Sequence, residues 1–460
     1  MIRASFVRTC AVVGISAIVG AGLASCSGGG TGSSSGLVTI KVDGLPTKQA
    51  NPAGRKQFLA DVAAFNTLHK GKIKVVPSEY VWSADTFAPR LASGQLENVF
   101  YVPFTEPQKL ISRHQAADIT PYLSVVPSVK SANPKLLSIG QSSGKTYGVP
   151  TAGYAEGLIY NRTLFTRAGL DPNKPPTTWD DVRADAKKIS ALSKNIVGFN
   201  MPTEDNYGGW YFTMMNYSFG NLMETKKNGK YAANFPNAKS IQVLKLLHDM
   251  HWTDHSMGSK GLQTAADVEK QMAAGQLGMY TAAGDNINTV VTQYGGNLKD
   301  FGLSSYPQQG GNSTLAGGSM EMFNPKDTPA QIKAALQWVQ YEYLRSYTDS
   351  SAAKRVFAAQ AKDKTTYIGV PAVPLFSGSL QQRYLNAENS YINAPVNNYR
   401  SYGSWLKTVK LQPEPPVSAQ LVYKALDSAV QQVLTKQGAD PRSALQSAAG
   451  QATTAISSGS

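Results

Sequence analysis

The chain has 460 residues, of which 42% are hydrophobic and 16% charged, so it is neither a disordered chain nor a bundle of membrane spans. Its cysteines are Cys10 and Cys26, which excludes a disulfide scaffold, a zinc ribbon and an iron–sulfur site. The 44 Lys and Arg exceed the 30 Asp and Glu, giving a formal charge of +14. These basic residues are scattered, and the densest runs are pairs such as Lys187-Lys188. Because nucleic-acid binding needs a clustered basic surface, we predict no nucleic-acid partner.

Basic residues at the start of the chain precede an uncharged apolar stretch at residues 11–23. The stretch is too short to span a bilayer, which needs about 20 apolar residues, and it is typical of a secretory signal. Its end, Leu23-Ala24-Ser25-Cys26, resembles the lipobox of bacterial lipoproteins. The resemblance implies a signal peptide at residues 1–25, a lipid anchor on Cys26 and a position on the outer face of the bacterial cytoplasmic membrane. An ordinary cleaved signal with an incidental cysteine is the alternative.

Residues 26–36 are rich in Gly and Ser and predict a flexible tether. Beyond it, residues 37–42 alternate and are rich in β-branched side chains, so they predict a strand. Residues 55–68 carry apolar side chains at helical spacing, and residues 72–76 and 98–102 return to strand. This alternation of strand and helix predicts an α/β fold.

The clearest helix start is at Thr178. Two prolines precede Thr178, which can cap the helix, and Asp181 stands three residues later as the acidic partner of a capping box. Further helices are predicted at residues 238–250, 328–345 and 418–434.

The segment that reads YGVPTAGYAEGLIYNRTLFTRAGLDP (147–172), followed by PPTTWDD (175–181), resembles the extracellular solute-binding proteins of ABC importers. Within that family it is most similar to the carbohydrate-binding, maltose-binding-protein-like group. Weaker similarity covers ADITPYL at 117–123 and MAAGQLGM at 272–279.

The resemblance implies a two-lobed α/β fold of the periplasmic-binding-protein type, in which hinge-connected lobes enclose a central ligand cleft. We expect residues 37–152 plus 284–325 to form the first lobe and residues 153–283 plus 326–460 to form the second. The implied function is the lipid-anchored substrate-binding component of an ABC transporter, a monomer that captures a sugar or oligosaccharide and delivers it to the permease. It implies no enzymatic activity and no cofactor.

Sugar recognition needs aromatic faces for the C–H faces of the ring and polar groups for the hydroxyls. The resemblance places such groups at strand ends, cleft loops and a glycine pair. The predicted ligand contacts are Trp82, Phe104, Glu106, Tyr154, Trp210, Tyr211, Asp285, Asn286, Gly317, Gly318, Tyr399 and Tyr402. For the aromatic residues a place in the core or at its rim is the alternative, and for Glu106 and Asp285 an ordinary surface position.

Signals for other function classes are weaker. Residues 140–144 match the Gly-x-Ser-x-Gly pattern of hydrolases, but a turn and a strand follow instead of the helix that this pattern requires. His248, His251 and His255 could bind zinc, yet they stand at what looks like a helix end, so we predict no metal. A secreted carbohydrate-active hydrolase stays open as a rival. Disaccharide, longer oligosaccharide, amino sugar, glycerol phosphodiester or another polar solute all stay open as ligands.

Overall fold

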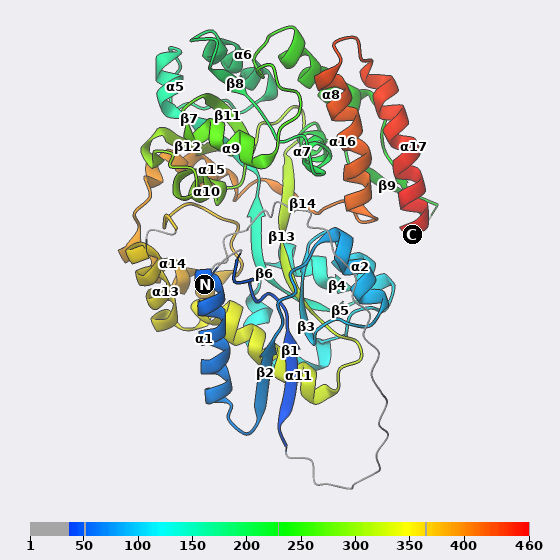
Figure 1. Cartoon of the computed structure of the whole chain (residues 1–460), viewed down its shortest axis with the longest axis vertical. Helices are drawn as coiled ribbons and strands as arrows, with labels where there is room; N and C mark the ends of the chain where they lie inside the picture. The colour runs from blue at the N-terminus through cyan, green and yellow to red at the C-terminus, as the bar shows by residue number, and fades with distance from the viewer. Residues whose placement is uncertain (1–35, 50–51, 229, 364–365, 460) are drawn as a thin grey trace.

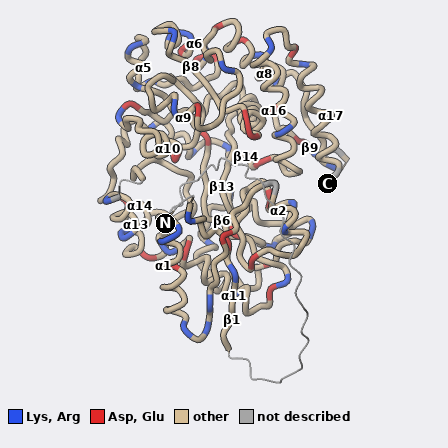
Figure 2. Tube along the Cα trace, viewed as in Figure 1, with Lys and Arg blue, Asp and Glu red and all other residues tan. Residues whose placement is uncertain are grey.

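A computed structural model describes residues 36–49, 52–228, 230–363 and 366–459. The predicted signal peptide, the lipid anchor at Cys26 and almost all of the tether lie outside these residues. Two lobes follow one another along the long axis of the molecule, and β6 and β13 run along the middle between them (Figure 1). In the same view Lys and Arg are spread over both lobes rather than gathered on one face (Figure 2).

The first lobe is built on a six-stranded sheet in the order β14-β13-β3-β1-β2, with β6 paired to β13. The strand β1 lies parallel to β2 and β3, and β13 lies antiparallel to β3 and β6. The strands are β1 (Val38–Val42), β2 (Ile73–Pro77), β3 (Val99–Pro103), β6 (Gly148–Ala155), β13 (Ser313–Phe323) and β14 (Lys410–Gln412). The helices of this lobe include α1 (Pro52–Leu68), α2 (Ala84–Ala92), α3 (Pro107–Ser112), α4 (Pro134–Leu137) and α11 (Pro329–Val339).

The second lobe has a four-stranded sheet in the order β12-β7-β11-β8. Its strands are β7 (Gly157–Asn161), β8 (Val197–Phe199), β11 (Leu277–Ala282) and β12 (Phe301–Ser304). Its helices are α5 (Arg162–Arg167), α6 (Trp179–Ser190), α7 (Tyr207–Ser218), α8 (Ala238–Trp252), α9 (Ala265–Ala273), α10 (Asn286–Thr292), α15 (Arg400–Trp405), α16 (Ala419–Thr435) and α17 (Pro441–Gly459). The remaining elements are the hairpins β4 (Gln141–Ser142) with β5 (Lys145–Thr146) and β9 (Glu224–Lys227) with β10 (Lys230–Ala233), and the helices α12 (Arg345–Thr348), α13 (Ser350–Asp363) and α14 (Gly378–Glu388).

Most of the elements predicted from periodicity are confirmed. The strand predicted at 37–42 and the helix predicted at 55–68 are β1 and α1. The helix α6 begins after Thr178, whose Oγ1 accepts a hydrogen bond of 3.1 Å from the Asp181 backbone N–H. Gly140 ends a short 3-10 helix, and residues 141–144 begin the β4–β5 hairpin, whose turn has positive φ at Ser143 and Gly144, so residues 140–144 do not form a nucleophile elbow.

The lobe boundaries expected from the sequence need correction. Ile287 and Phe301, expected in the first lobe, pack in one apolar cluster with Ile159 of β7 in the second. Trp338, expected in the second lobe, lies 5.3 Å from Phe65 of α1 in the core of the first (distance between ring centroids). The predicted boundaries were wrong because strand and helix alternate in the same way in both lobes. Periodicity therefore does not show which sheet a segment joins.

The chain passes between the lobes at a single residue after β6. Ala155 still pairs with Ala316 of β13, and Gly157 already pairs with Ala282 of β11. Glu156 is therefore the link between the two sheets. A second passage runs through β13, in which Leu315 packs in a core cluster of the second lobe and Met320 packs in that of the first.

The approach of α7 to α16 in the second lobe requires a glycine. A Cβ on Gly209 would lie 2.0 Å from the backbone oxygen of Tyr423 on α16. This is a steric clash that only a shift of the backbone could relieve. A Cβ on Gly450, an exposed position inside α17, would meet nothing within 4 Å.

We expect Gly209→Ala to lower the free energy of unfolding by about 1–3 kcal/mol, because α7 and α16 must separate to accept the methyl group. The matched change Gly450→Ala should raise it by roughly 0.5–1 kcal/mol, since alanine loses less backbone entropy in a helix. Urea unfolding of the two variants and the wild type measures both changes. Equal stability of the Gly209→Ala protein and the wild type would contradict this packing.

Candidate ligand-binding site

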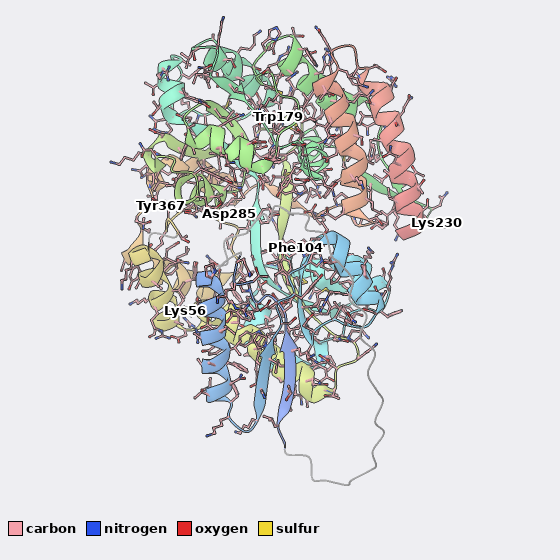
Figure 3. The ribbon with its side chains drawn as sticks, in the orientation of Figure 1. Lys56, Phe104, Trp179, Lys230, Asp285 and Tyr367 are labelled. Carbon is pink, nitrogen blue, oxygen red and sulfur yellow. The ribbon has the colours of Figure 1, made fainter. Side chains whose placement is uncertain are left out.

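Three carboxylates from separate parts of the chain interact electrostatically at the passage between the lobes. Glu156 links β6 to β7, Asp285 lies between β11 and α10, and Glu414 lies between β14 and α16. The negative charges of Asp285 and Glu414 both act on Glu156. We call these three residues the boundary carboxylates. Asp285 and Phe104 lie near the middle of the long axis in Figure 3, well away from Trp179 in the second lobe and Lys56 in the first.

Glu156 is the most deeply enclosed boundary carboxylate, with 2% of its surface exposed. Its Oε2 atom is buried and has no hydrogen-bond partner among the described residues. Burial raises the pKa of Glu156 well above its ordinary value, and the charges of Asp285 and Glu414 raise it further. Burial therefore favours the protonated form of this side chain, and no Lys or Arg of the described residues counteracts the rise of its pKa.

Glu414 is held by two aromatic donors. The Tyr423 hydroxyl of α16 donates to its Oε2 atom, and Trp210 Nε1 of α7 donates to its Oε1 atom at 3.4 Å. Burial raises the pKa of Glu414 to about 7, although these two hydrogen bonds act to lower it. Glu414 thus links the site to the packing of α7 against α16.

Aromatic rings surround Trp210, whose own indole is partly exposed. Its ring centroid lies 6.5 Å from Tyr154, 6.0 Å from Tyr207 and 5.2 Å from Tyr211, each in an edge-to-face arrangement. Tyr154 comes from β6 and the other rings come from α7, so this contact joins the two lobes. The ring of Tyr154 covers Gly317, where a Cβ would lie 2.1 Å from it. Gly317 therefore makes room for the Tyr154 ring.

The N-terminus of α7 is fixed by a carboxylate from α16. Asp427 Oδ2 accepts a hydrogen bond of 2.8 Å from the backbone N–H of Asn206, and its Oδ1 accepts one of 2.7 Å from that of Gly209. These hydrogen bonds satisfy N–H groups that a helix start leaves unpaired. The cap and the close approach at Gly209 together set the position of Trp210.

Three other predicted ligand contacts, Phe104, Trp82 and Glu106, lie in the first lobe. Phe104 is buried, and its ring lies where a Cβ on Gly318 would be, at 2.5 Å. Trp82 is partly exposed and its ring centroid lies 6.2 Å from Phe87. Glu106 stands at the N-cap of α3 in the first lobe, where burial raises its pKa and Lys109 Nζ lies 3.9 Å from its Oε2 atom.

The remaining predicted contacts lie in the second lobe. Asn286 Nδ2 donates to Glu269 Oε1 at 2.9 Å. Tyr399 is fully buried in an apolar cluster of the second lobe, and the Tyr402 hydroxyl donates to the backbone oxygen of Ala155 at 2.5 Å. Tyr402 therefore braces the passage between the lobes. For all the residues predicted from the sequence, contact with a ligand stays a prediction.

Sequence reasoning missed Glu156, Glu414, Tyr207 and the capping role of Asp427. A signal existed for Glu156, because it is a lone charge directly before the fully buried strand β7. Glu414 stands among prolines in residues 413–416, a composition typical of a surface loop, so nothing in the sequence marks it. Tyr207 and Asp427 gain their roles from the packing of α7 on α16.

His248 and His251, two of the three histidines considered as zinc ligands, contact other groups. His248 Nε2 lies 2.7 Å from the backbone oxygen of Gln437, and the His251 ring packs edge-to-face on Trp252. Burial lowers the pKa of His251. Across the described residues, no group of three or more His, Cys, Asp or Glu is arranged to hold a metal ion.

Surface hollows lie elsewhere. One of about 420 Å³ is lined by residues of α13 and α14 that include Lys354 and Arg383. Another of about 370 Å³ is lined by residues that include Leu298 and Tyr367. Neither is lined by a boundary carboxylate or by Trp210. The candidate site is thus defined by the chemistry of its side chains and by its place between the lobes.

A family model described as bacterial extracellular solute-binding protein matches residues 60–371 of the chain. The chain belongs to this family. A binding protein of Brucella abortus is 31% identical over 173 residues, which is 37% of this chain and 40% of that protein. The sn-glycerol-3-phosphate-binding periplasmic protein UgpB of the same species is 27% identical over 173 residues, 35% of this chain and 37% of UgpB. These matches thus span less than half of the length of either relative.

The fold agrees with the family. A solute-binding protein of an ABC transporter from Thermotoga lettingae, solved with alpha-D-tagatose, superposes with a TM-score of 0.70 over 91% of this chain and 99% of that one, at 16% identity. The two-lobed α/β architecture predicted from the sequence is therefore confirmed. Among the helices of the described residues, none combines the length and the apolar character that crossing a membrane requires.

We expect Glu156→Gln to stabilise the protein at neutral pH. The ordinary pKa of this group is 4.5, and burial raises it in the folded state. Between these two pKa values the unfolded chain releases the proton that the folded protein retains, so the stability of the wild type falls as pH rises. Glutamine does not titrate, so the variant does not suffer this loss.

Thermal unfolding of both proteins at pH 4 and pH 8 checks this expectation. The gain in stability should be large at pH 8 and close to zero at pH 4, where glutamate is protonated in both states. Asp285, Glu414 and the tyrosines at 154, 207, 211, 280, 306 and 402 also interact with Glu156, so the change with pH should be broad. If Glu156→Gln is less stable than the wild type at pH 8, the expected stabilisation is refuted.

Proposed function

We propose that the protein is the substrate-binding component of an ABC importer, which captures a sugar or oligosaccharide outside the membrane and delivers it to the permease as a monomer. Membership of the solute-binding family supports binding rather than catalysis. The observation that carries the proposal is the meeting of Tyr154 of β6 with Trp210 of α7, beside Glu414, at the boundary between the lobes.

This arrangement has the chemistry that sugars require. The partly exposed faces of Trp210 and Tyr154 offer apolar area with a rigid geometry, and the carboxylates beside them accept hydrogen bonds from hydroxyl groups. A site between lobes is also where small ligands are most often enclosed. The tagatose bound to the Thermotoga lettingae protein supports the same ligand class.

A second candidate ligand is a glycerol phosphodiester or a related polar solute. The similarity to UgpB, a glycerol-3-phosphate-binding protein by its name, favours it. A secreted carbohydrate-active hydrolase is the rival outside transport. Recovery of the bound compound unchanged after long incubation with the protein supports the binding role, and its turnover supports the enzyme.

We expect Trp210→Ala to weaken sugar binding by at least about tenfold, because the ring face and the desolvated surface around it are both lost. Trp210→Phe should restore part of the affinity. Isothermal titration with the sugar recovered from a metabolite pull-down measures the effect, and Tyr122→Ala, at a partly buried ring of the first lobe, serves as the control. Unchanged affinity in Trp210→Ala would place the binding site elsewhere.

Lobe closure would accompany binding. After β6, the chain passes from one lobe to the other at Glu156 alone. Hinge closure around a ligand is a standard transition of two-lobed proteins. A smaller radius of gyration in solution scattering after addition of the sugar would support this mechanism.

We further propose that the protein is anchored through a lipid on Cys26 to the outer face of the bacterial cytoplasmic membrane. The motif at residues 23–26 and the Gly/Ser-rich residues after it support this proposal. A tether of this composition leaves the folded lobes free to reach a permease.

We expect Cys26→Ala to move the protein from the membrane fraction to the soluble fraction, because the variant has no thiol to acylate. Fractionation of producing cells followed by immunoblotting measures the distribution, and Cys10→Ala is the matched control that should stay in the membrane fraction. The lipoprotein proposal fails if Cys26→Ala and the wild type sediment with membranes to the same extent.

A further inference from the structure

One end of the first lobe carries exposed leucines. The turn between α1 and β2 lies beside the start of β1 at the lower end of the long axis (Figure 1), and the Val38 backbone N–H donates to the Lys72 oxygen at 2.9 Å. Leu68, at the start of this turn, has 69% of its surface exposed, the largest fraction among the large hydrophobic side chains of the described residues. Leu37, directly before β1, has 39% exposed. Single exposed leucines are common, but these two stand at the same end of the lobe.

The same end of the lobe is basic. Lys70, Lys72 and Lys74 are exposed, and none of them forms an ion pair with another described residue. Residues 36–42 and 62–78 contain no Asp or Glu, and Figure 2 shows Lys and Arg blue along the turn. We call the five residues Leu37, Leu68, Lys70, Lys72 and Lys74 the basal surface.

The backbone that carries the basal surface is fixed by the core of the lobe. The Lys72 N–H donates to the His69 oxygen at 2.9 Å, and the His69 ring lies 4.3 Å from that of Phe65, which is fully buried (distance between ring centroids). Asn66 joins the end of α1 to β2, since its side chain exchanges hydrogen bonds of 2.7 and 3.0 Å with the Val75 backbone. Little backbone freedom is therefore lost when a partner meets this surface.

The tether predicted from the sequence ends at the basal surface. The described chain begins at Gly36, directly before Leu37, and the ten residues 26–35 separate it from Cys26. A Gly/Ser-rich chain of that length has a root-mean-square span of about 17 Å and reaches at most about 35 Å. A lipid on Cys26 would therefore hold this end of the first lobe close to the membrane, whereas α6 lies at the opposite end of the long axis (Figure 1).

We propose that the basal surface docks on an anionic lipid surface, with the two leucines in the headgroup region and the three lysines facing the phosphates. The inference rests on the proposed lipid anchor and adds a second contact to it. Lysines close to an anionic membrane and apolar side chains that enter its interface both add to the affinity of an acylated protein. The contact itself can be weak, because a short flexible tether gives an effective concentration of about millimolar.

The position of the basal surface fits this role. It lies at an end of the long axis, whereas Asp285 and Phe104 lie near the middle (Figures 1 and 3). Docking through this end leaves the passage between the lobes and the whole second lobe away from the lipid. A docked protein thus keeps the lobes free to close on a solute.

Binding of the Cys26→Ala protein to vesicles tests the basal surface without the anchor. One set of vesicles is pure phosphatidylcholine, and the other contains equal parts of phosphatidylcholine and phosphatidylglycerol. We expect the partition coefficient, measured by co-sedimentation, to be at least about tenfold higher for the anionic vesicles, since each lysine near an anionic surface contributes a factor of about five. Raising the salt concentration should reduce this preference, because salt screens the lysines.

Two triple variants of the Cys26→Ala protein assign the binding to particular lysines. Replacing the three lysines of the basal surface by Gln should lower the partition coefficient on anionic vesicles by at least about tenfold. The matched control is Lys174→Gln/Lys188→Gln/Lys194→Gln, at three exposed lysines on or beside α6 that form no ion pair with a described residue. This control should bind as tightly as the parent protein.

Leu68→Ser tests the apolar contact. It should lower the partition coefficient by about tenfold, because the leucine side chain no longer moves from water into the membrane interface. Leu262→Ser, at a leucine of the second lobe with 45% of its surface exposed, is the control and should have no effect. Since both leucines are exposed, both variants should unfold at the temperature of the parent protein.

The outcomes separate this inference from the proposed function. Equal binding to the two sets of vesicles, or an unchanged partition coefficient after loss of the three basal lysines, overturns the inference. Self-association that only the basal lysines support would assign the surface to a second copy, and loss of solute uptake in cells without a change in vesicle binding would assign it to the permease. Either result overturns lipid docking. No sugar and no acyl chain enter the vesicle measurement, so its failure leaves the solute-binding function and the anchor at Cys26 to their own tests.

Discussion

The rest of the site depends on how tightly the backbone is held where it passes from one sheet to the other. Ala155 is paired with β13 and Gly157 with β11, so the single residue between them has no freedom to turn its side chain toward solvent. Tyr402 holds the passage from a third direction, since its hydroxyl binds the Ala155 oxygen and its ring lies where a Cβ on Gly157 would be, at 2.7 Å. The Glu156 backbone oxygen in turn accepts a hydrogen bond of 3.1 Å from Thr314 Oγ1. A carboxylate at this position is buried by the path of the chain.

The same principle positions Trp210, although through a helix rather than a strand. The indole is held because α7 packs against α16 at the distance that Gly209 allows, and because Asp427 of α16 binds the first backbone N–H groups of α7. Glu414 then meets Trp210 from the segment that joins β14 to α16. Rigid elements therefore place both the aromatic and the acidic groups, which is the condition for a site that gains affinity from preorganisation.

How much the sequence predicts depends on whether a feature is local. The strand β1, the helix α1 and the cap of α6 at Thr178 follow from periodicity and short-range hydrogen bonding, and the sequence predicts them well. The assignment of Phe301 and Trp338 to lobes depends on which distant strand or helix each meets, and there the prediction was wrong. At the site, the resemblance to the solute-binding family suggests Trp210 and Asp285. The grouping of Glu156 with Glu414, however, joins residues that are more than two hundred positions apart. No local pattern contains that grouping.

A buried carboxylate with an unsatisfied oxygen lowers the stability of the folded protein, so its presence needs a physical reason. Neutral residues of similar size would pack at the passage between the lobes at lower cost. Within the described part of the chain, no hydrogen bond reaches the Glu156 Oε2 atom and no cation counteracts the rise of its pKa, so neither offsets that cost. Sites that bind ligands often keep such unfavourable groups, because the energy lost in the free protein is regained when the ligand supplies the missing partner.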